Sequence, residues 1–149
     1  MPVSFRDARA EDLPAIVAML ADDPLGARRE GAPDDPAYAA AFAAIVADPG
    51  ERLIVAERDG AVVGSLQIGF IPGLSRRGAW RGQIEGVRVA AGARGQGIGE
   101  AMVLWAVEEC RRRGCAMVQL TTDRSRADAH RFYARLGFEQ SHLGFKLML

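Results

Sequence analysis

The sequence predicts a mixed α/β (α+β) fold in a single domain, residues 1–149, with a central sheet of six or seven strands and about four helices on both faces. The second half of the chain reads as strand, glycine-rich turn, long amphipathic helix and strand, an order that favours parallel strands joined by a right-handed helical crossover. Asp59-Gly60 lies between two apolar runs and predicts an antiparallel hairpin. With 149 residues, of which 49% are hydrophobic, the chain is long enough for one compact domain with its own core.

The first elements are a strand, a helix, a loop and a second helix. Residues 3–5 alternate between apolar and polar as in a strand, and apolar residues recur at helical spacing over residues 13–20. Residues 24–36 are rich in proline, glycine and charge, which predicts a mobile loop. Asp35 and Pro36 fit the N-cap and the first position of the second helix. We expect this helix to bury Phe42, Ile45 and Val46.

The middle of the chain predicts three strands. Residues 53–57 and 61–71 form the hairpin, and a loop at residues 74–79 leads to the next strand. That strand, residues 83–89, carries Gly86 near its centre. A glycine inside a strand indicates a β-bulge or a backbone left open to a ligand.

The last elements are a long helix, a strand, a short helix and two final strands. The helix of residues 97–113 has one apolar face, places glutamates four residues before arginines, and ends at Gly114 in the C′ position. Residues 116–121 predict a buried strand, and residues 127–136 predict a helix that stops at Gly137.

The segment Arg-Gly-Gln-Gly-Ile-Gly at residues 94–99 has the features of an anion site. Its glycines let the backbone turn sharply and approach a ligand closely. The first N–H groups of the following helix, at the positive end of its dipole, are suited to a phosphate. A Walker loop would need Gly-Lys-Ser/Thr, and a dinucleotide loop would need Gly-x-Gly-x-x-Gly, so neither pattern fits. The alternative is a glycine turn that only opens the helix.

The same segment resembles the acetyl-CoA diphosphate loop of the GNAT N-acetyltransferase superfamily, Gln/Arg-x-x-Gly-x-Gly/Ala, with Arg94, Gly97 and Gly99 at the defining positions. Residues 129–138, Ala-His-Arg-Phe-Tyr-Ala-Arg-Leu-Gly-Phe, resemble the closing motif Ala-x-x-x-Tyr-x-x-x-Gly-Phe of the same superfamily. Because two motifs occur in the family's order, the chain is identified as a member.

The resemblance implies a sheet that is splayed between its fourth and fifth strands, with the pantetheine arm of acetyl-CoA in the gap. The implied cofactor-binding residues are Val87, Arg88, Val89, Arg94, Gly95, Gln96, Gly97, Ile98, Gly99, Glu100 and Arg126. Arg126 stands where many members have an asparagine that touches the cofactor, so that contact is either replaced by an arginine–phosphate contact or missing. No metal is implied.

Two residues are candidates for proton transfer. Acetyl transfer from a thioester needs a deprotonated amine, a close approach of the amine to the thioester carbonyl and a donor for the oxyanion. The resemblance assigns Tyr133 as the proton donor to the leaving thiolate and Glu85 as the general base, acting directly or through water. The alternatives are a packing role for Tyr133 and, for Glu85, an ion pair with Arg88 or Arg94.

The predicted function is transfer of an acetyl group to the primary amine of a small molecule. A peptide or protein amine acetyltransferase and a non-catalytic acyl-CoA-binding module are the alternatives. Related proteins are often dimers, so a homodimer is expected. The acceptor pocket is expected at residues 25–35, with a second wall near residues 76–80, and the acceptor itself is not specified by the sequence.

Charge and cysteine content exclude other classes. Lysine plus arginine and aspartate plus glutamate balance at 19 each, which is not typical of a nucleic-acid module or of a protein drawn to anionic membranes. Cys110 and Cys115 have no metal-site spacing and predict two buried thiols in a reducing compartment. The N-terminus shows no secretory pattern, so a soluble cytoplasmic protein is expected.

Overall fold

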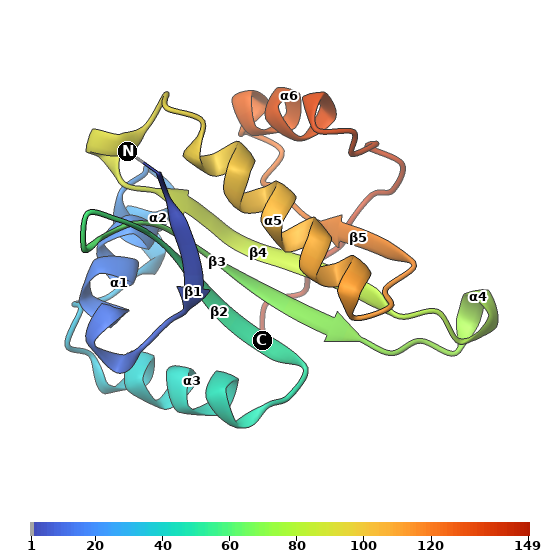
Figure 1. Cartoon of the computed structure of the whole chain (residues 1–149), viewed down its shortest axis with the longest axis horizontal. Helices are drawn as coiled ribbons and strands as arrows, with labels where there is room; N and C mark the ends of the chain where they lie inside the picture. Colours follow the sequence, from blue (N-terminus) through green and yellow to red (C-terminus); the bar gives the residue numbers. More distant parts are fainter. Residues whose placement is uncertain (1) are drawn as a thin grey trace. The chain divides into compact units, whose positions relative to one another are not determined.

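The computed structural model describes residues 2–149, which group into two compact units. The first unit ends at Gln119 and contains most of the sheet, and the second unit is Leu120–Leu149. Figure 1 shows the first unit as a twisted sheet with the long helix α5 running along its strands.

The elements occur in mixed order along the chain. In the first unit they are β1 (Ser4–Asp7), η1 (Ala10–Asp12), α1 (Leu13–Ala21), α2 (Gly26–Arg29), α3 (Pro36–Ala47), β2 (Glu51–Arg58), β3 (Ala61–Ile71), α4 (Ser75–Gly78), β4 (Arg81–Val89), η2 (Ala91–Ala93), α5 (Ile98–Arg112) and β5 (Met117–Leu120), whose last residue begins the second unit. The second unit also contains α6 (Ala127–Arg135).

The sheet has five strands in the order β1-β2-β3-β4-β5, and it is mixed, as predicted. The first four strands are antiparallel neighbours. The last pair, β4 and β5, is parallel. Ala116 N–H donates to Trp80 O just before both strands begin, and three residues further along both strands the Gln119 side chain donates to that of Gln83.

The predicted number of elements is wrong in detail. There are five strands rather than six or seven, and the described chain contains α2 and α4 as additional single turns. Residues 138–149 form no strand, although apolar residues alternate over residues 143–149. Alternation specifies which side chains share a face, but a strand also needs a ladder partner, and the sequence pattern does not supply one.

Local turn and capping predictions are confirmed. Asp59 and Gly60 have φ values of 53° and 78°, as a two-residue hairpin with positive φ at both positions requires. The Asp35 carboxylate accepts from Ala37 N–H at 2.9 Å and caps α3. Gly114 has φ +81° and ends the last turn of α5, as expected for a C′ glycine.

The core lies on both faces of the sheet, so the prediction of helices on both faces is also confirmed. A Cβ built at Gly64 would lie 3.3 Å from Met102 Sδ, and one at Gly82 would lie 2.3 Å from Cys110 Sγ, so α5 covers that face. On the other face, α1 packs against β2 through three buried side chains: Ile16, Met19 and Val55.

Two helix-surface predictions are wrong. Val46 on α3 is 67% exposed rather than buried, although Phe42 and Ile45 are half-buried. On α5 the ion pairs join Glu108 to Arg111 and Glu109 to Arg112, three residues apart, rather than four apart. Arg113, the expected partner of Glu109, instead donates to Pro49 O at 2.9 Å and lies 4.1 Å from the Phe70 ring centre.

A buried carboxylate joins the start of the chain to the sheet. Asp12 is 6% exposed and receives two hydrogen bonds from Arg6, at 2.7 and 3.1 Å, and one from Arg9 N–H at 2.7 Å. Arg6 also pairs with Glu57 of β2 at 2.8 Å. The hydrogen bonds from Arg6 hold the pKa of Asp12 below its ordinary value, against the opposing effect of burial.

Candidate active site

The centre of β4 contains the predicted β-bulge. Glu85 lies opposite Gln67 and Arg88 lies opposite Ser65, so β4 uses one more residue than β3 over this stretch. Gly86 has φ +62°, a conformation that favours glycine. Residues three apart in a regular strand lie on opposite faces, but the extra residue places Glu85 and Arg88 on the same face.

The ladder between β4 and β5 stops just before this bulge. Gln119, the third residue of β5, contacts Gln83, the third residue of β4, through its side chain. β5 has four residues and β4 has nine, so β5 ends one residue after this contact. β4 therefore continues through Glu85 to Val89 beyond the end of β5, as an opening between these strands requires.

The Glu85 side chain is exposed. The two arginines weighed as its partners are engaged elsewhere. Arg88 pairs with Asp23 at 3.4 Å, and Arg94 pairs with Asp22 at 3.2 Å. Both arginines are thus paired with aspartates of the segment that follows α1.

Arg88 connects β4 to the segment between α1 and α2. Its Nη1 donates to Val87 O at 2.9 Å, and its Nη2 faces Asp23. Asp23 in turn accepts from Gly26 N–H at 2.6 Å, so the start of α2 is tied to the strand with the bulge. Ser65, opposite Arg88, is 1% exposed, which shows that this end of the face is closed to solvent.

The glycine loop lies between η2 and α5, where the sequence predicts an anion site. Gly95 and Gly97 have φ values of 75° and 79°, and a Cβ built at either position meets no atom within 4 Å. Gly97 is the N-cap of α5 and has no side chain to cap it, so the first turn of the helix faces the loop. This open backbone cradle at a helix N-terminus fits a diphosphate.

Side chains around the loop fix its shape. Arg94 Nε donates to Val89 O at 3.1 Å, and Arg94 Nη2 reaches Asp22 at the end of α1. Gln96 Oε1 accepts from Arg58 Nη1 at 2.6 Å, which brings a second guanidinium beside the loop. Sequence reasoning missed Arg58, because it lies 38 residues earlier, at the hairpin turn, and only its charge could have pointed to it.

The second unit holds the other two predicted site residues. Tyr133 is half-buried on α6, and its ring makes edge contacts with Phe132 and Phe138 at centroid distances of 5.0 and 5.8 Å. Arg126 is the residue before α6, and an open hollow of about 360 Å³ is lined by residues 125–129. His130 Nε2 lies 3.1 Å from Asp123 O. The remaining predicted site residues all belong to the first unit.

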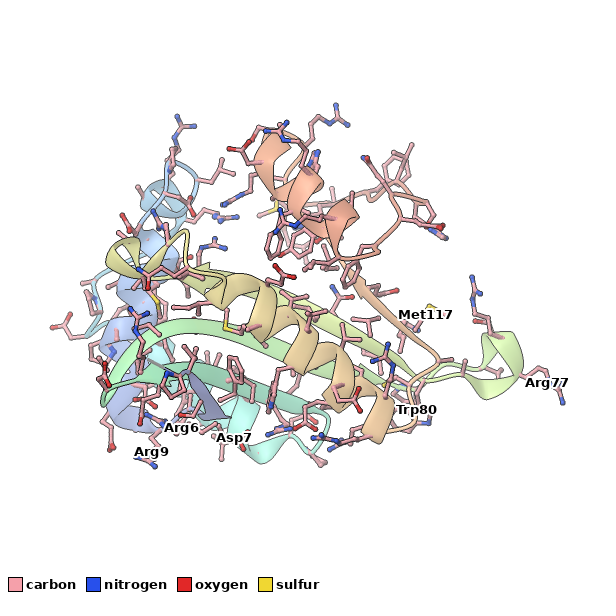
Figure 2. All side chains as sticks on the ribbon, turned by 45° about the horizontal axis from the view of Figure 1, so that its top comes forward. Arg6, Asp7, Arg9, Arg77, Trp80 and Met117 are labelled. Atoms are coloured by element: carbon pink, nitrogen blue, oxygen red, sulfur yellow. The ribbon has the colours of Figure 1, made fainter. Side chains whose placement is uncertain are left out.

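The two expected walls of the acceptor pocket differ in form. Arg28 and Arg29 are exposed on the short helix α2, where a loop was predicted. Arg76 and Arg77 lie in α4 with positive φ values of 55° and 61°, so this segment is a turn rather than a regular helix. Figure 2 shows Arg77 at the outer end of α4, pointing away from the sheet. Figure 1 shows α4 projecting beyond the strand ends.

Comparison with known proteins identifies the family. A family model described as the acetyltransferase (GNAT) family matches residues 13–138.

The chain belongs to the GNAT acetyltransferase family.

Individual relatives agree with this membership. The aminoalkylphosphonate N-acetyltransferase of Salmonella typhimurium is 36% identical to this GNAT chain over 146 residues, which are 97% of the chain and 91% of that protein. A crystal structure of a transcriptional regulator from Bacillus halodurans C-125 superposes with a TM-score of 0.96 and 48% identity, and it covers 99% of this chain and 100% of that one. A crystal structure of an acetyltransferase from Trypanosoma brucei superposes with a TM-score of 0.81 and 27% identity. This match covers 99% of this chain and 100% of that one.

The protein is therefore an enzyme of the GNAT N-acetyltransferase class. Among residues 2–149, no three or more histidine, cysteine, aspartate or glutamate side chains gather as ligands for one metal ion. None of the helices in this described part of the chain has the length and hydropathy needed to span a bilayer.

Proposed function

We propose that this GNAT enzyme transfers the acetyl group of acetyl-CoA directly to the primary amine of a small molecule. The observation that carries the proposal is the continuous path from the bulge at Gly86, along a part of β4 that β5 does not pair, into the open glycine cradle before α5. The Salmonella typhimurium relative, named for N-acetylation of aminoalkylphosphonates, supports a small amine as the acceptor.

The backbone of residues 95–100 would hold the diphosphate of acetyl-CoA. Positive φ at Gly95 and Gly97 directs the loop around an anion, and the N-terminus of α5 adds its partial positive charge. Arg94 shapes this loop through Val89 and Asp22. Val87 and Val89 on β4 would line the pantetheine arm. We assign Arg126, in the second unit, to a phosphate as well.

Bound acetyl-CoA would supply the acyl thioester. Glu85 would take a proton from the acceptor ammonium, directly or through one water, because an amine attacks only with a free lone pair. As the new C–N bond forms and the C–S bond breaks, Tyr133 would give its hydroxyl proton to the departing thiolate. The acylated nitrogen would release its second proton to water, from which the tyrosinate is reprotonated. No covalent enzyme intermediate is part of this proposal.

An aminoalkylphosphonate is the first acceptor to test. Such a molecule carries an ammonium for Glu85 and an anionic group for an arginine. Arg28 and Arg29 on α2 are the candidates for the anion, since the segment that holds α2 is tied to β4 through Asp23 and Arg88.

The function can be tested with an assay for free thiol. Purified protein and acetyl-CoA would be incubated with aminoalkylphosphonates, other small primary amines and peptides with free amines. Release of thiol with the small amines, together with a product heavier by one acetyl group, supports the proposal. Turnover with peptides alone would support peptide acetylation, and coenzyme A binding without turnover would support a binding module. A cytoplasmic homodimer remains a prediction.

A further inference from the structure

A row of polar side chains crosses four strands on the sheet face opposite α5. Glu51 of β2 lies opposite Gly69 of β3, which in turn lies opposite Gln83 of β4. Gln67 of β3 lies opposite Glu85. The row extends to β5 because the Gln119 amide donates to Gln83 Oε1 at 2.7 Å.

The hydrogen bond between Gln67 and Glu51 fixes the orientation of the Gln67 amide. Gln67 Nε2 donates to Glu51 Oε2 at 3.0 Å. Because an ionised carboxylate can only accept, the amide nitrogen must face Glu51. The Gln67 carbonyl oxygen, on the other branch of the amide, is then turned away from Glu51.

The Glu51 carboxylate reaches Gln67 because Gly69 has no side chain. A Cβ built at Gly69 would lie 2.7 Å from Glu51 Oε1, closer than real atoms approach. The carboxylate therefore lies across the backbone of β3 at Gly69. Any other residue at this position would displace Glu51 and release the amide.

This arrangement leaves two acceptors side by side. Directly opposed residues in an antiparallel pair have Cβ atoms about 4.5–5.5 Å apart. The side chains of Gln67 and Glu85 are thus neighbours, and the Gln67 carbonyl oxygen and the Glu85 carboxylate cannot donate to each other. A group with several N–H donors between them would satisfy both, and a primary ammonium has three.

We propose that Gln67, oriented by Glu51, is a second ligand of the acceptor amine beside Glu85, an inference that rests on the proposed acetyltransferase function. The ammonium donates one N–H to Glu85 and another to the Gln67 carbonyl. When the first N–H bond breaks and its proton moves to Glu85, the second still holds the nitrogen, so its lone pair keeps one direction. Gln67 is then a substrate-binding residue, and Glu51 is a positioning residue.

Steady-state kinetics of three variants test this proposal. Gln67→Met keeps the length of the side chain and removes its carbonyl. In Glu51→Gln the new amide can both donate and accept, so residue 51 no longer fixes the orientation of the Gln67 amide. Glu108→Gln is the matched control, because Glu108 is a half-exposed carboxylate on α5 that pairs with Arg111 at 3.0 Å. The probe is aminoethylphosphonate, or the panel amine that the wild-type enzyme acetylates fastest.

We expect Gln67→Met to raise the acceptor KM about tenfold or more, because a hydrogen bond to a charged group is lost. Glu51→Gln should raise it about threefold, since the amide can still take the correct orientation part of the time. Coenzyme A affinity measured by calorimetry and the Tm should stay close to wild type in all three variants, and Glu108→Gln should leave the acceptor KM unchanged.

Distinct results would overturn the inference and the proposed function. If the wild-type enzyme acetylates the amine and Gln67→Met leaves its KM within about twofold, Gln67 is not an amine ligand. A parallel loss of acceptor affinity, coenzyme A affinity and Tm would show a structural role and would also overturn it. A wild-type protein that acetylates no amine in the panel contradicts the proposed function itself, and the inference with it.

Discussion

The Sγ atom of Cys110 lies 2.3 Å from the point that a Cβ at Gly82 would occupy. This is the place where α5 approaches β4 most tightly among the glycine positions on that strand. Cys110 is fully buried, and burial raises the pKa of its thiol to about 11. The thiol is therefore a small apolar packing group between helix and sheet.

Replacing Gly82 with alanine should destabilise the fold. We expect the free energy of unfolding to fall by about 1–3 kcal/mol, because the added methyl group overpacks the contact with Cys110. Cys110→Ala in the same chain should recover part of this loss, which a double-mutant cycle in urea would measure. Gly92→Ala is the control, since a Cβ at Gly92 meets nothing within 4 Å. If the changes in unfolding free energy of the two substitutions simply add in the double variant, the predicted contact between residue 82 and Cys110 is contradicted.

Stability should depend on pH through Asp12. Its pKa is lowered in the folded state by Arg6, so its carboxylate stabilises the fold above its unfolded pKa of about 3.9, and the contribution is lost as pH falls through the folded value. Between about pH 5 and pH 2, the unfolding free energy of the wild type should therefore decrease more steeply than that of Asp12→Asn. Urea unfolding at several pH values would show this, and parallel slopes would exclude Asp12 as the cause.

The conformation of Gly97 should govern coenzyme A affinity. At φ +79° an alanine costs about 1–2 kcal/mol, so Gly97→Ala should weaken coenzyme A binding about 5- to 30-fold. Calorimetry with coenzyme A measures this without turnover. Gly92→Ala, at a glycine outside the positive-φ set, should bind as the wild type does. Unchanged binding by Gly97→Ala would place the diphosphate away from this loop.

Glu85→Gln should lower kcat by about 10²- to 10⁴-fold, because the amide cannot take the ammonium proton. Coenzyme A affinity should remain near that of the wild type, since the diphosphate cradle is formed by other residues. Glu108→Gln serves as the charge-matched control. A fully active Glu85→Gln enzyme would mean that another base acts, or that the amine arrives already neutral.

Tyr133→Phe should reduce kcat by a similar factor of about 10²–10⁴ if the hydroxyl protonates the thiolate. The ring contacts with Phe132 and Phe138 would be kept, so α6 should remain folded. An acyl donor with a more acidic leaving thiol should recover activity, because it needs less help from a proton donor. Without such recovery, the hydroxyl acts in some other way.

Features set by neighbouring residues were predictable from the sequence. The hairpin turn at Asp59-Gly60, the Asp35 cap and the bulge at Gly86 each follow from what one or two residues allow the backbone to do. The glycine loop is of the same kind. Its conformation is a local property, and the helix that follows supplies the charge.

Features that depend on distant partners were not predictable. Arg113 could pair within its helix, but Phe70 and Pro49 offer it a ring and a carbonyl from other elements. Gln67 and Glu51 look like ordinary surface residues of two strands, and only the register of the sheet brings them together. The prediction of two final strands was wrong for a related reason. A strand needs a partner for its hydrogen-bond ladder, and no local sequence pattern encodes that partner.

The single extra residue at Gly86 also has a consequence for how this chain can change length during evolution. Removing it would restore one-to-one pairing with β3 while Arg88 stays opposite Ser65 and Val89 stays opposite Gly64, so these side chains would keep their sides. A deletion here should therefore remove the bulge and leave the rest of the strand in register, and the exposed turn at Asp59-Gly60 should accept added residues with little loss.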